Sequence, residues 1–348
     1  MKFSTKFNHA MRPAAQYGMT LIELMISMMI GMFLLLGTMT VYQQSRSSFR
    51  VADSVARLQE NARFILDLME PDIRLAKYWG LAAEPGTIGI VPPAVVITCD
   101  TVDTSAAMLP PTNYSTWALN VLRPIQGVDE TSGYGHATLG IPCSPRFGVG
   151  TQQPQSDALV VRHAAGQTAP LTNGITQVHT GLMQAAIFNN GVAPFVPANP
   201  AVAPTQTHNV VTNVYYVSQS SDLDPATPSL RIKTLIAGGI HQDQELLPGV
   251  ENLQVQFGIS TDNDQDVERY VDPDHAALNI PGVEIVSVRL WMLLRADRME
   301  VGFTDTKTYV PPDPDFNITP CAPGPGCIYP SDHRRLVASK TILLRNTR

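Results

Sequence analysis

The sequence predicts an α+β protein. A long N-terminal α-helix, membrane-spanning and then amphipathic, should pack on an antiparallel β-sheet head that carries a loop-rich insertion. Three observations predict this class. A run that is apolar apart from Glu23 and a few hydroxyl residues fills residues 19–41, and an apolar stripe at helical spacing continues it through residues 51–73. The last third of the chain contains short runs in which apolar and polar residues alternate, as they do in strands.

The apolar run is long enough to cross a bilayer. Its 23 residues span about 35 Å as a helix at 1.5 Å per residue. Glu23 is its only ionisable side chain, and a charge at that depth is costly without a partner. The preceding residues 1–18 carry Lys2, Lys6 and Arg12 and no acidic residue.

Three interpretations of this N-terminus compete. A secretory signal needs a small-residue cleavage site after the apolar run, and Tyr42–Arg46 is a poor one. A plain membrane anchor, with the basic leader in the cytoplasm, fits the charges but leaves Glu23 unexplained. In the third interpretation, the segment from Gly18 to Met25 resembles the class III leader of type IV prepilins and pseudopilins.

That resemblance implies a processing site and an assembly contact. A prepilin peptidase would cut after Gly18 and methylate the new amine of Met19, a position where phenylalanine is commonest in the family. Glu23 would then be the fifth residue of the mature protein. In a filament core its carboxylate could neutralise the terminal amine of a neighbouring subunit, so that two costly charges become one pair.

The helix should continue beyond the membrane. Apolar residues recur at steps of three and four from Val51 to Ile73, and no proline interrupts the chain before Pro71, where we expect a kink or restart before an end at Lys77. The predicted segments are a leader at 1–18, a transmembrane half at 19–41, an amphipathic half at 42–79 and a periplasmic or extracellular β-rich head at 80–348.

Within the head, residues 80–204 are turn-rich and weakly patterned, and the C-terminal third is clearer. The residues from Leu253 to Ile259 alternate as in a half-buried strand. The other expected strands are Asp157–His163, Val210–Val217, Leu230–Ile236, Val283–Leu294 and Leu336–Leu344.

Four cysteines form an even set in a chain expected to be exported, so disulfides are predicted. Of three possible connectivities we favour Cys321–Cys327 across a Pro/Gly loop, which leaves Cys99–Cys143. A zinc site is the alternative, but no C-x-x-C spacing occurs.

An alternating carboxylate series at Asp262, Asp264 and Asp266 could wrap a calcium ion with oxygen ligands. It departs from an EF-hand, because Val267 replaces the sixth-position glycine and Pro273 the twelfth-position glutamate. A polar hairpin turn, in which these side chains bond their own backbone, is the alternative. No other cofactor is indicated.

Composition and motifs argue against two function classes. Without the leader, 21 basic residues face 30 acidic ones, a net charge of −9, so we expect no nucleic-acid partner. Signatures of hydrolases, zinc proteases, P-loop proteins and dinucleotide-binding proteins are absent from the sequence, so we do not expect an enzyme.

Two further regions resemble PilW-type minor pilins. One is the helix end from Pro71 to Gly80, and the other is the C-terminal region, including Leu247–Gly258, Val286–Arg295 and the closing stretch from Arg334 to Arg345. The resemblance implies a subunit that initiates type IV pilus assembly, near the tip. Its partners would be the prepilin peptidase, other minor pilins, the major pilin, inner-membrane lipid and possibly a large tip adhesin.

The same resemblance implies a location and two alternatives. The protein would sit in the inner membrane as a single-pass protein with its head in the periplasm, and afterwards in the pilus fibre at the cell surface. The alternatives are a pseudopilin of type II secretion and a pilus-borne ligand-binding or adhesive module ordered by calcium.

Overall fold

The structure is a computed structural model. It describes residues 18–82, 85–90, 95–100, 111–129, 143, 145–146, 152–196, 205–262, 264–300, 302–313 and 316–345. The expected leader therefore lies outside the described residues, except for Gly18. The chain divides into two compact units, residues 1–53 and residues 54–348.

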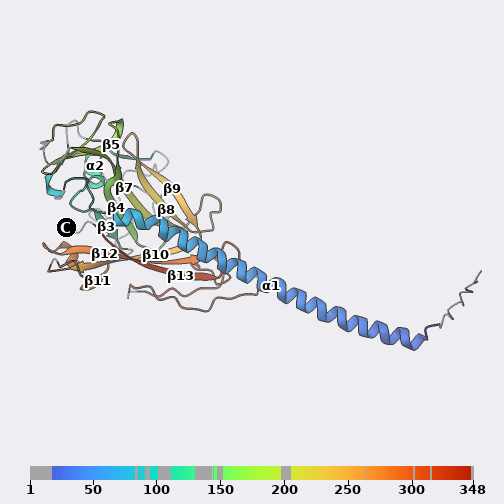
Figure 1. Ribbon diagram of the computed structural model, residues 1–348. Coiled ribbons are helices and arrows are strands. Elements are labelled where there is room, and N and C mark those ends of the chain that lie inside the picture. Colours follow the sequence, from blue (N-terminus) through green and yellow to red (C-terminus); the bar gives the residue numbers. More distant parts are fainter. Residues whose placement is uncertain are drawn as a thin grey trace, which may run out of the picture. The chain divides into compact units, whose positions relative to one another are not determined.

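One helix, α1 (Leu21–Arg74), runs from the first unit into the second (Figure 1). Its buried side chains begin at Leu58 and follow the predicted stripe: Leu58, Ala62, Ile65, Leu66, Met69 and Ile73. The helix continues through Pro71 rather than restarting there, and it ends at Arg74 instead of Lys77. A proline this close to the end removes one hydrogen bond from a turn that is already terminating.

The chain leaves the helix through residues with left-handed backbone conformations. Lys77 and Gly80 both have a φ of 70°. At Gly80 a Cβ atom would lie 2.7 Å from the Thr180 hydroxyl oxygen, so this turn needs glycine both for its backbone and for space.

The second unit contains a nine-stranded sheet. The sequence predicted three of its strands, at Asp157–His163, Val210–Val217 and Leu230–Ile236, and missed the other six. Its strands run in the order β1-β6-β5-β7-β8-β9-β2, with β4 also paired to β7 and β3 paired to β4. Most pairs are antiparallel, but β1–β6 and β2–β9 are parallel. The strands are β1 (Ile88–Ile90), β2 (Thr98–Cys99), β3 (Ile125–Val128), β4 (Ala158–Thr168), β5 (Asn173–Thr180), β6 (Ala185–Asn190), β7 (Gln206–Ser218), β8 (Ser229–Ile236) and β9 (Ile240–Pro248).

A four-stranded antiparallel sheet follows, in the order β11-β10-β12-β13. Its strands are β10 (Val250–Ser260), β11 (Arg269–Val271), β12 (Glu284–Arg295) and β13 (Arg335–Leu343). The short helices are α2 (Pro111–Ala118), η1 (Pro85–Thr87) and η3 (Ala276–Asn279). The strands predicted in the C-terminal third match β7, β8, β10, β12 and β13 within a few residues.

The C-terminal half of α1 lies in a core shared by both sheets. Side chains from α1, β4, β7, β8, β10, β12 and β13 form one buried apolar cluster, and Figure 1 shows the helix passing between β4, β7 and β8 on one side and β10, β12 and β13 on the other. Burial of this many aliphatic and aromatic side chains fixes the helix in the head.

Strand β10 is buried on both faces, so the prediction of a half-buried strand is wrong. Its apolar residues face the shared core, whereas its polar residues are covered by loops. Asn252 donates to the Tyr329 hydroxyl at 3.1 Å, and Gln254 donates to the Gln155 carbonyl at 2.9 Å. The two faces of β10 differ in polarity as the alternation predicts, but other parts of the protein cover the polar face and keep it from water.

Candidate assembly site

The N-terminus of α1 is closed by its own side chains. The Thr20 amide donates to a carboxylate oxygen of Glu23 at 3.0 Å, and the Thr20 hydroxyl donates to the same oxygen at 2.9 Å. The Glu23 amide donates back to the Thr20 hydroxyl oxygen at 3.4 Å. This is a capping box, which satisfies amides that the first turn leaves free. The T-x-x-E pattern of residues 20–23 predicts such a cap, so it could have identified Thr20, which was not among the predicted site residues.

The structure places the predicted processing residues directly before this cap. Gly18 and Met19 are exposed and precede the first helical turn. Large apolar side chains from Met19 to Tyr42 are exposed within the described unit, and in the described part of the chain α1 is the one helix long and apolar enough to cross a membrane. A bilayer or neighbouring apolar helices would cover such a surface.

Hydroxyl groups inside the apolar run are satisfied within the helix. Ser27 donates to the Glu23 carbonyl at 2.7 Å, Thr38 to the Leu35 carbonyl at 2.9 Å, and Thr40 to the Gly37 carbonyl at 2.8 Å. The run can therefore enter hydrocarbon without exposing free hydroxyl donors, and Glu23 is left as its one ionisable group.

At the other end of α1, Asp72 attaches the helix to the nine-stranded sheet. Its carboxylate contacts His163 Nε2 at 2.7 Å and accepts from Asn213 at 3.1 Å and from the Tyr215 hydroxyl at 2.8 Å. Burial, reinforced by the charge of Asp72, raises the pKa of Tyr215 far above its usual range. Nothing in the linear pattern marked Asp72, because its partners lie more than 90 residues away.

The two disulfides join the pairs that the sequence analysis favoured. Cys99 bonds to Cys143 with a Cα–Cα distance of 5.7 Å, and Cys321 bonds to Cys327 at 5.9 Å. The zinc alternative has no support in this arrangement, because every cysteine is oxidised.

The acidic turn after β10 bonds largely to itself. Asp262 and Asp264 both accept from the Ser260 hydroxyl, at 3.3 and 3.4 Å, and the Asp266 amide donates to Asp264 at 2.9 Å. Among the described residues, no group of three His, Cys, Asp or Glu side chains is arranged to hold a metal. Calcium binding stays a prediction, which titration calorimetry of the full-length protein with calcium would test; absence of binding heat would contradict it.

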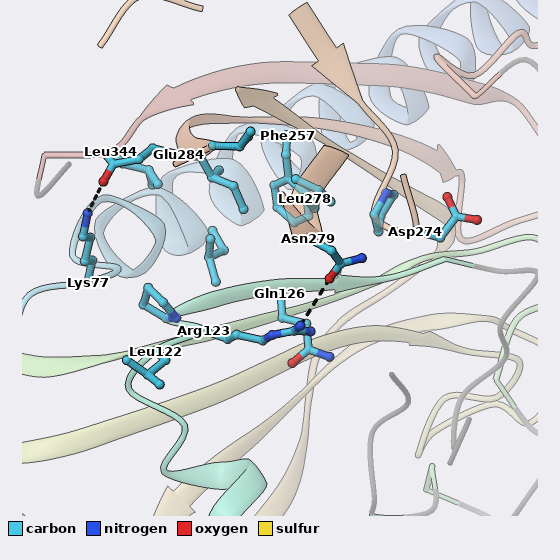
Figure 2. Close-up of a pocket in the computed structure, with 16 residues that line it drawn as sticks. Lys77, Leu122, Arg123, Gln126, Phe257, Asp274, Leu278, Asn279, Glu284 and Leu344 are labelled. Atoms are coloured by element: carbon cyan, nitrogen blue, oxygen red, sulfur yellow. Dashed lines mark hydrogen bonds and ion pairs between the residues drawn. The ribbon is translucent and has the colours of Figure 1, made fainter. Parts of the chain in front are cut away.

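A groove of about 260 Å³ is lined by residues just before and within β3, by residues of the connection between β11 and β12, and by Lys77, which follows α1. Figure 2 shows its largely apolar walls, including Phe257 and Leu278. Lys77 pairs with Glu284 at 3.2 Å, and Arg123 donates to Asn279 at 3.2 Å. These contacts join polar side chains at the rim, and the four residues form no constellation of nucleophile, base and acid.

Comparison with known proteins locates two family regions on this fold. Residues 13–39 match the model of the prokaryotic N-terminal methylation motif, and residues 214–346 match that of type IV pilus-assembly protein W (PilW). A type IV-like pilin from Thermus thermophilus aligns with 12% identity over 56% of this chain and 82% of its own, at a TM-score of 0.27. No curated protein matches.

A capped apolar helix that carries the methylation motif, continued into a β-rich head, defines a type IV pilin-class protein that is membrane-anchored and pilus-associated. The match over residues 214–346 covers β8 to β13, the four-stranded sheet included. The two matches support a PilW-like type IV minor pilin.

Proposed function

We propose that this protein is processed by prepilin peptidase and takes part in initiating type IV pilus assembly near the pilus tip. Cleavage after Gly18 would free the amine of Met19, which the peptidase would methylate. Before assembly the protein would lie in the inner membrane with its head in the periplasm. It would then join other minor pilins, the major pilin and a large tip adhesin, and become part of the surface fibre. The proposed segments are those predicted from the sequence, except that α1 ends at Arg74.

The observation that carries this proposal is the position of Glu23. It is the one ionisable residue in an exposed apolar helix, and its carboxylate lies at the first turn, directly beside the proposed new terminus. Before assembly, the Thr20 amide and hydroxyl would satisfy this carboxylate locally. In a filament, the amine of a neighbouring subunit could compete for the same oxygen, and pairing two desolvated charges would favour assembly.

The capping and pairing roles of Glu23 can be separated. Glu23→Gln keeps an acceptor for the cap but removes the charge, whereas Thr20→Ala removes the hydroxyl of the cap and keeps the charge. We expect E23Q to reach the membrane and fail to support surface pili, and T20A to support them. Electron microscopy and shear-recovered pili would measure this.

Processing is tested by Gly18→Ala together with mass spectrometry of the mature N-terminus. We expect methylated Met19 in the wild type, and uncleaved protein and reduced piliation for G18A. Ser27→Ala, a small change deeper in the same run, is the control. Normal piliation by both G18A and E23Q would disprove the proposal.

A pseudopilin of type II secretion is the second candidate within the assembly class. The match of residues 214–346 to the pilus-assembly family favours the pilus. Gene deletion separates the two, because loss of twitching supports the pilus role, while intact twitching with blocked exoprotein release supports the secretion role.

A further inference from the structure

Just beyond the apolar run, α1 presents a compact group of aromatic and cationic side chains. Tyr42, Arg46, Phe49 and Arg50 fall within about 100° of the helix circumference at 3.6 residues per turn. All four are exposed, Tyr42 by 65% and Phe49 by 75%. We call these four residues the belt.

The belt is cationic, and its two arginines form no ion pair among the described residues. Neither Arg46 nor Arg50 forms an ion pair with another described side chain, although Arg63 and Arg74, farther along the same helix, each pair with a carboxylate. No acidic residue occurs between Glu23 and Asp53. The nearest acidic residue, Asp53, follows Arg50 by three residues on the same helix, and no described carboxylate is bonded to either of the two exposed guanidinium groups.

We infer that the belt binds the phosphate groups of membrane phospholipids and thereby sets the depth of α1 in the bilayer. Guanidinium groups match phosphate geometry, and tyrosine and other large aromatics favour the headgroup level. The hydroxyls of Thr38 and Thr40, one turn earlier, are bonded within the helix and so suit hydrocarbon. The change from an internally satisfied surface to a cationic one marks the edge of the membrane.

The depth set by the belt decides where Glu23 lies. Tyr42 lies nineteen positions after Glu23, which is about 29 Å of helix. The hydrocarbon layer is about 30 Å thick. With Tyr42 held at one interface, Glu23 lies at the opposite interface, where water or headgroups can reach its carboxylate. The belt thus keeps Glu23 out of the centre of the bilayer until a neighbouring subunit replaces the lipid.

The inference depends on the proposed function only for the identity of the membrane that α1 crosses. Its test measures the depth of α1 in lipid vesicles, so its outcome does not depend on piliation. The native cysteines are all paired, so one introduced cysteine carries a nitroxide label in the full-length protein. Labels at Gln43→Cys and Met25→Cys report the two ends of the span in vesicles of phosphatidylethanolamine and phosphatidylglycerol. Depth is measured from collision with oxygen and with an aqueous nickel complex.

We expect the wild-type label at position 43 to read at the headgroup level. Arg46→Gln with Arg50→Gln should move it deeper by one helical turn, about 5 Å, and should make the label at position 25 more accessible to nickel. Arg46→Lys with Arg50→Lys should restore the wild-type depth. Arg57→Gln with Arg63→Gln removes the same charge beyond the belt and should leave the depth unchanged.

An unchanged depth in R46Q/R50Q would overturn the inference. If that variant lost pili while its depth stayed constant, the arginines would contact a neighbouring subunit instead of lipid. If pili were unaffected but the depth moved, lipid binding by the belt would stand and only its importance for assembly would fall.

Discussion

At Asp72 a single carboxylate receives contacts from three side chains on two strands of the nine-stranded sheet. His163 Nδ1 faces the Ala164 carbonyl at 2.8 Å while Nε2 faces Asp72. Both partners of the ring are acceptors, so His163 can donate to the two of them at once only as an imidazolium. The end of the helix is thus held by polar groups as well as by apolar packing.

Asp72→Ala should lower the free energy of unfolding by about 2–4 kcal/mol, because it leaves buried donors without their acceptor. Asp67→Ala is the matched control, since Asp67 is exposed and makes a surface pair with Lys340 at 3.2 Å, and it should cost less than about 1 kcal/mol. Urea denaturation of the detergent-solubilised protein would measure both. Equal losses would show that the Asp72 contacts add nothing to stability.

His241 on β9 gives the head a predictable pH dependence. Burial, with the nearby charges of Lys233 and Arg162, lowers the pKa of His241 to about 3. The unfolded chain protonates this ring near pH 6.5, whereas the folded chain does not until about pH 3. The unfolded state therefore binds more protons in this range, and stability falls as the pH drops from about 6.5, by up to roughly 1.4 kcal/mol per pH unit.

His241→Gln should remove this contribution to the pH dependence of stability. Thermal unfolding between pH 7 and about pH 4.5 would measure it. His275→Asn is the control, because His275 is exposed and caps η3 through a ring nitrogen that an asparagine oxygen can replace. The idea fails if H241Q keeps the wild-type slope.

At the scale of elements, the C-terminal half of α1 belongs to the head rather than being a stalk beneath it. Leu58, Ile65, Met69 and Ile73 are at most 3% exposed and lie in the core shared by both sheets. A soluble fragment that starts after Lys77 would lack all of them. Burial of each such aliphatic side chain stabilises the fold by about 1.5–3 kcal/mol. Because the net free energy of unfolding is small, the loss of several of these contributions would unfold the head.

We therefore expect a fragment of residues 54–348 to unfold cooperatively and a fragment of residues 78–348 to be unfolded or aggregated. Circular dichroism and thermal melting would compare them. Adjacent helix positions supply the control within the longer fragment, because Ile65→Ser should disrupt folding while Phe64→Ser, at a 52% exposed side chain, should not. A stable fragment of residues 78–348 would contradict the shared core.

The elements also show what sequence could and could not reveal. The apolar run, the stripe on α1 and the strands β7, β8, β10, β12 and β13 follow from local periodicity. The roles of Gly18, Met19 and Glu23 rest on one short motif and stay predictions. Strands β5 and β6 pair with each other as a local hairpin and were missed because apolar and polar residues are mixed in them without regular alternation. Asp72 and the buried polar face of β10 were missed because only the tertiary structure reveals what covers them.

At the scale of the whole molecule, the two disulfides close loops of very different length. The separation is 44 residues for Cys99–Cys143 and 6 for Cys321–Cys327. Restricting the unfolded chain gives about 4 kcal/mol for the long loop and about 2 kcal/mol for the short one. C99S/C143S should therefore lower the melting temperature more than C321S/C327S, as differential scanning calorimetry would show. The reverse order would mean that native packing around the bonds outweighs loop entropy.

The edges of the nine-stranded sheet have a further consequence. The strands at its two ends, β1 and β2, are three and two residues long, and both pair in the parallel sense. So short an edge offers few free backbone groups to a foreign strand. A foreign strand would therefore find little to pair with at these two ends of the nine-stranded sheet.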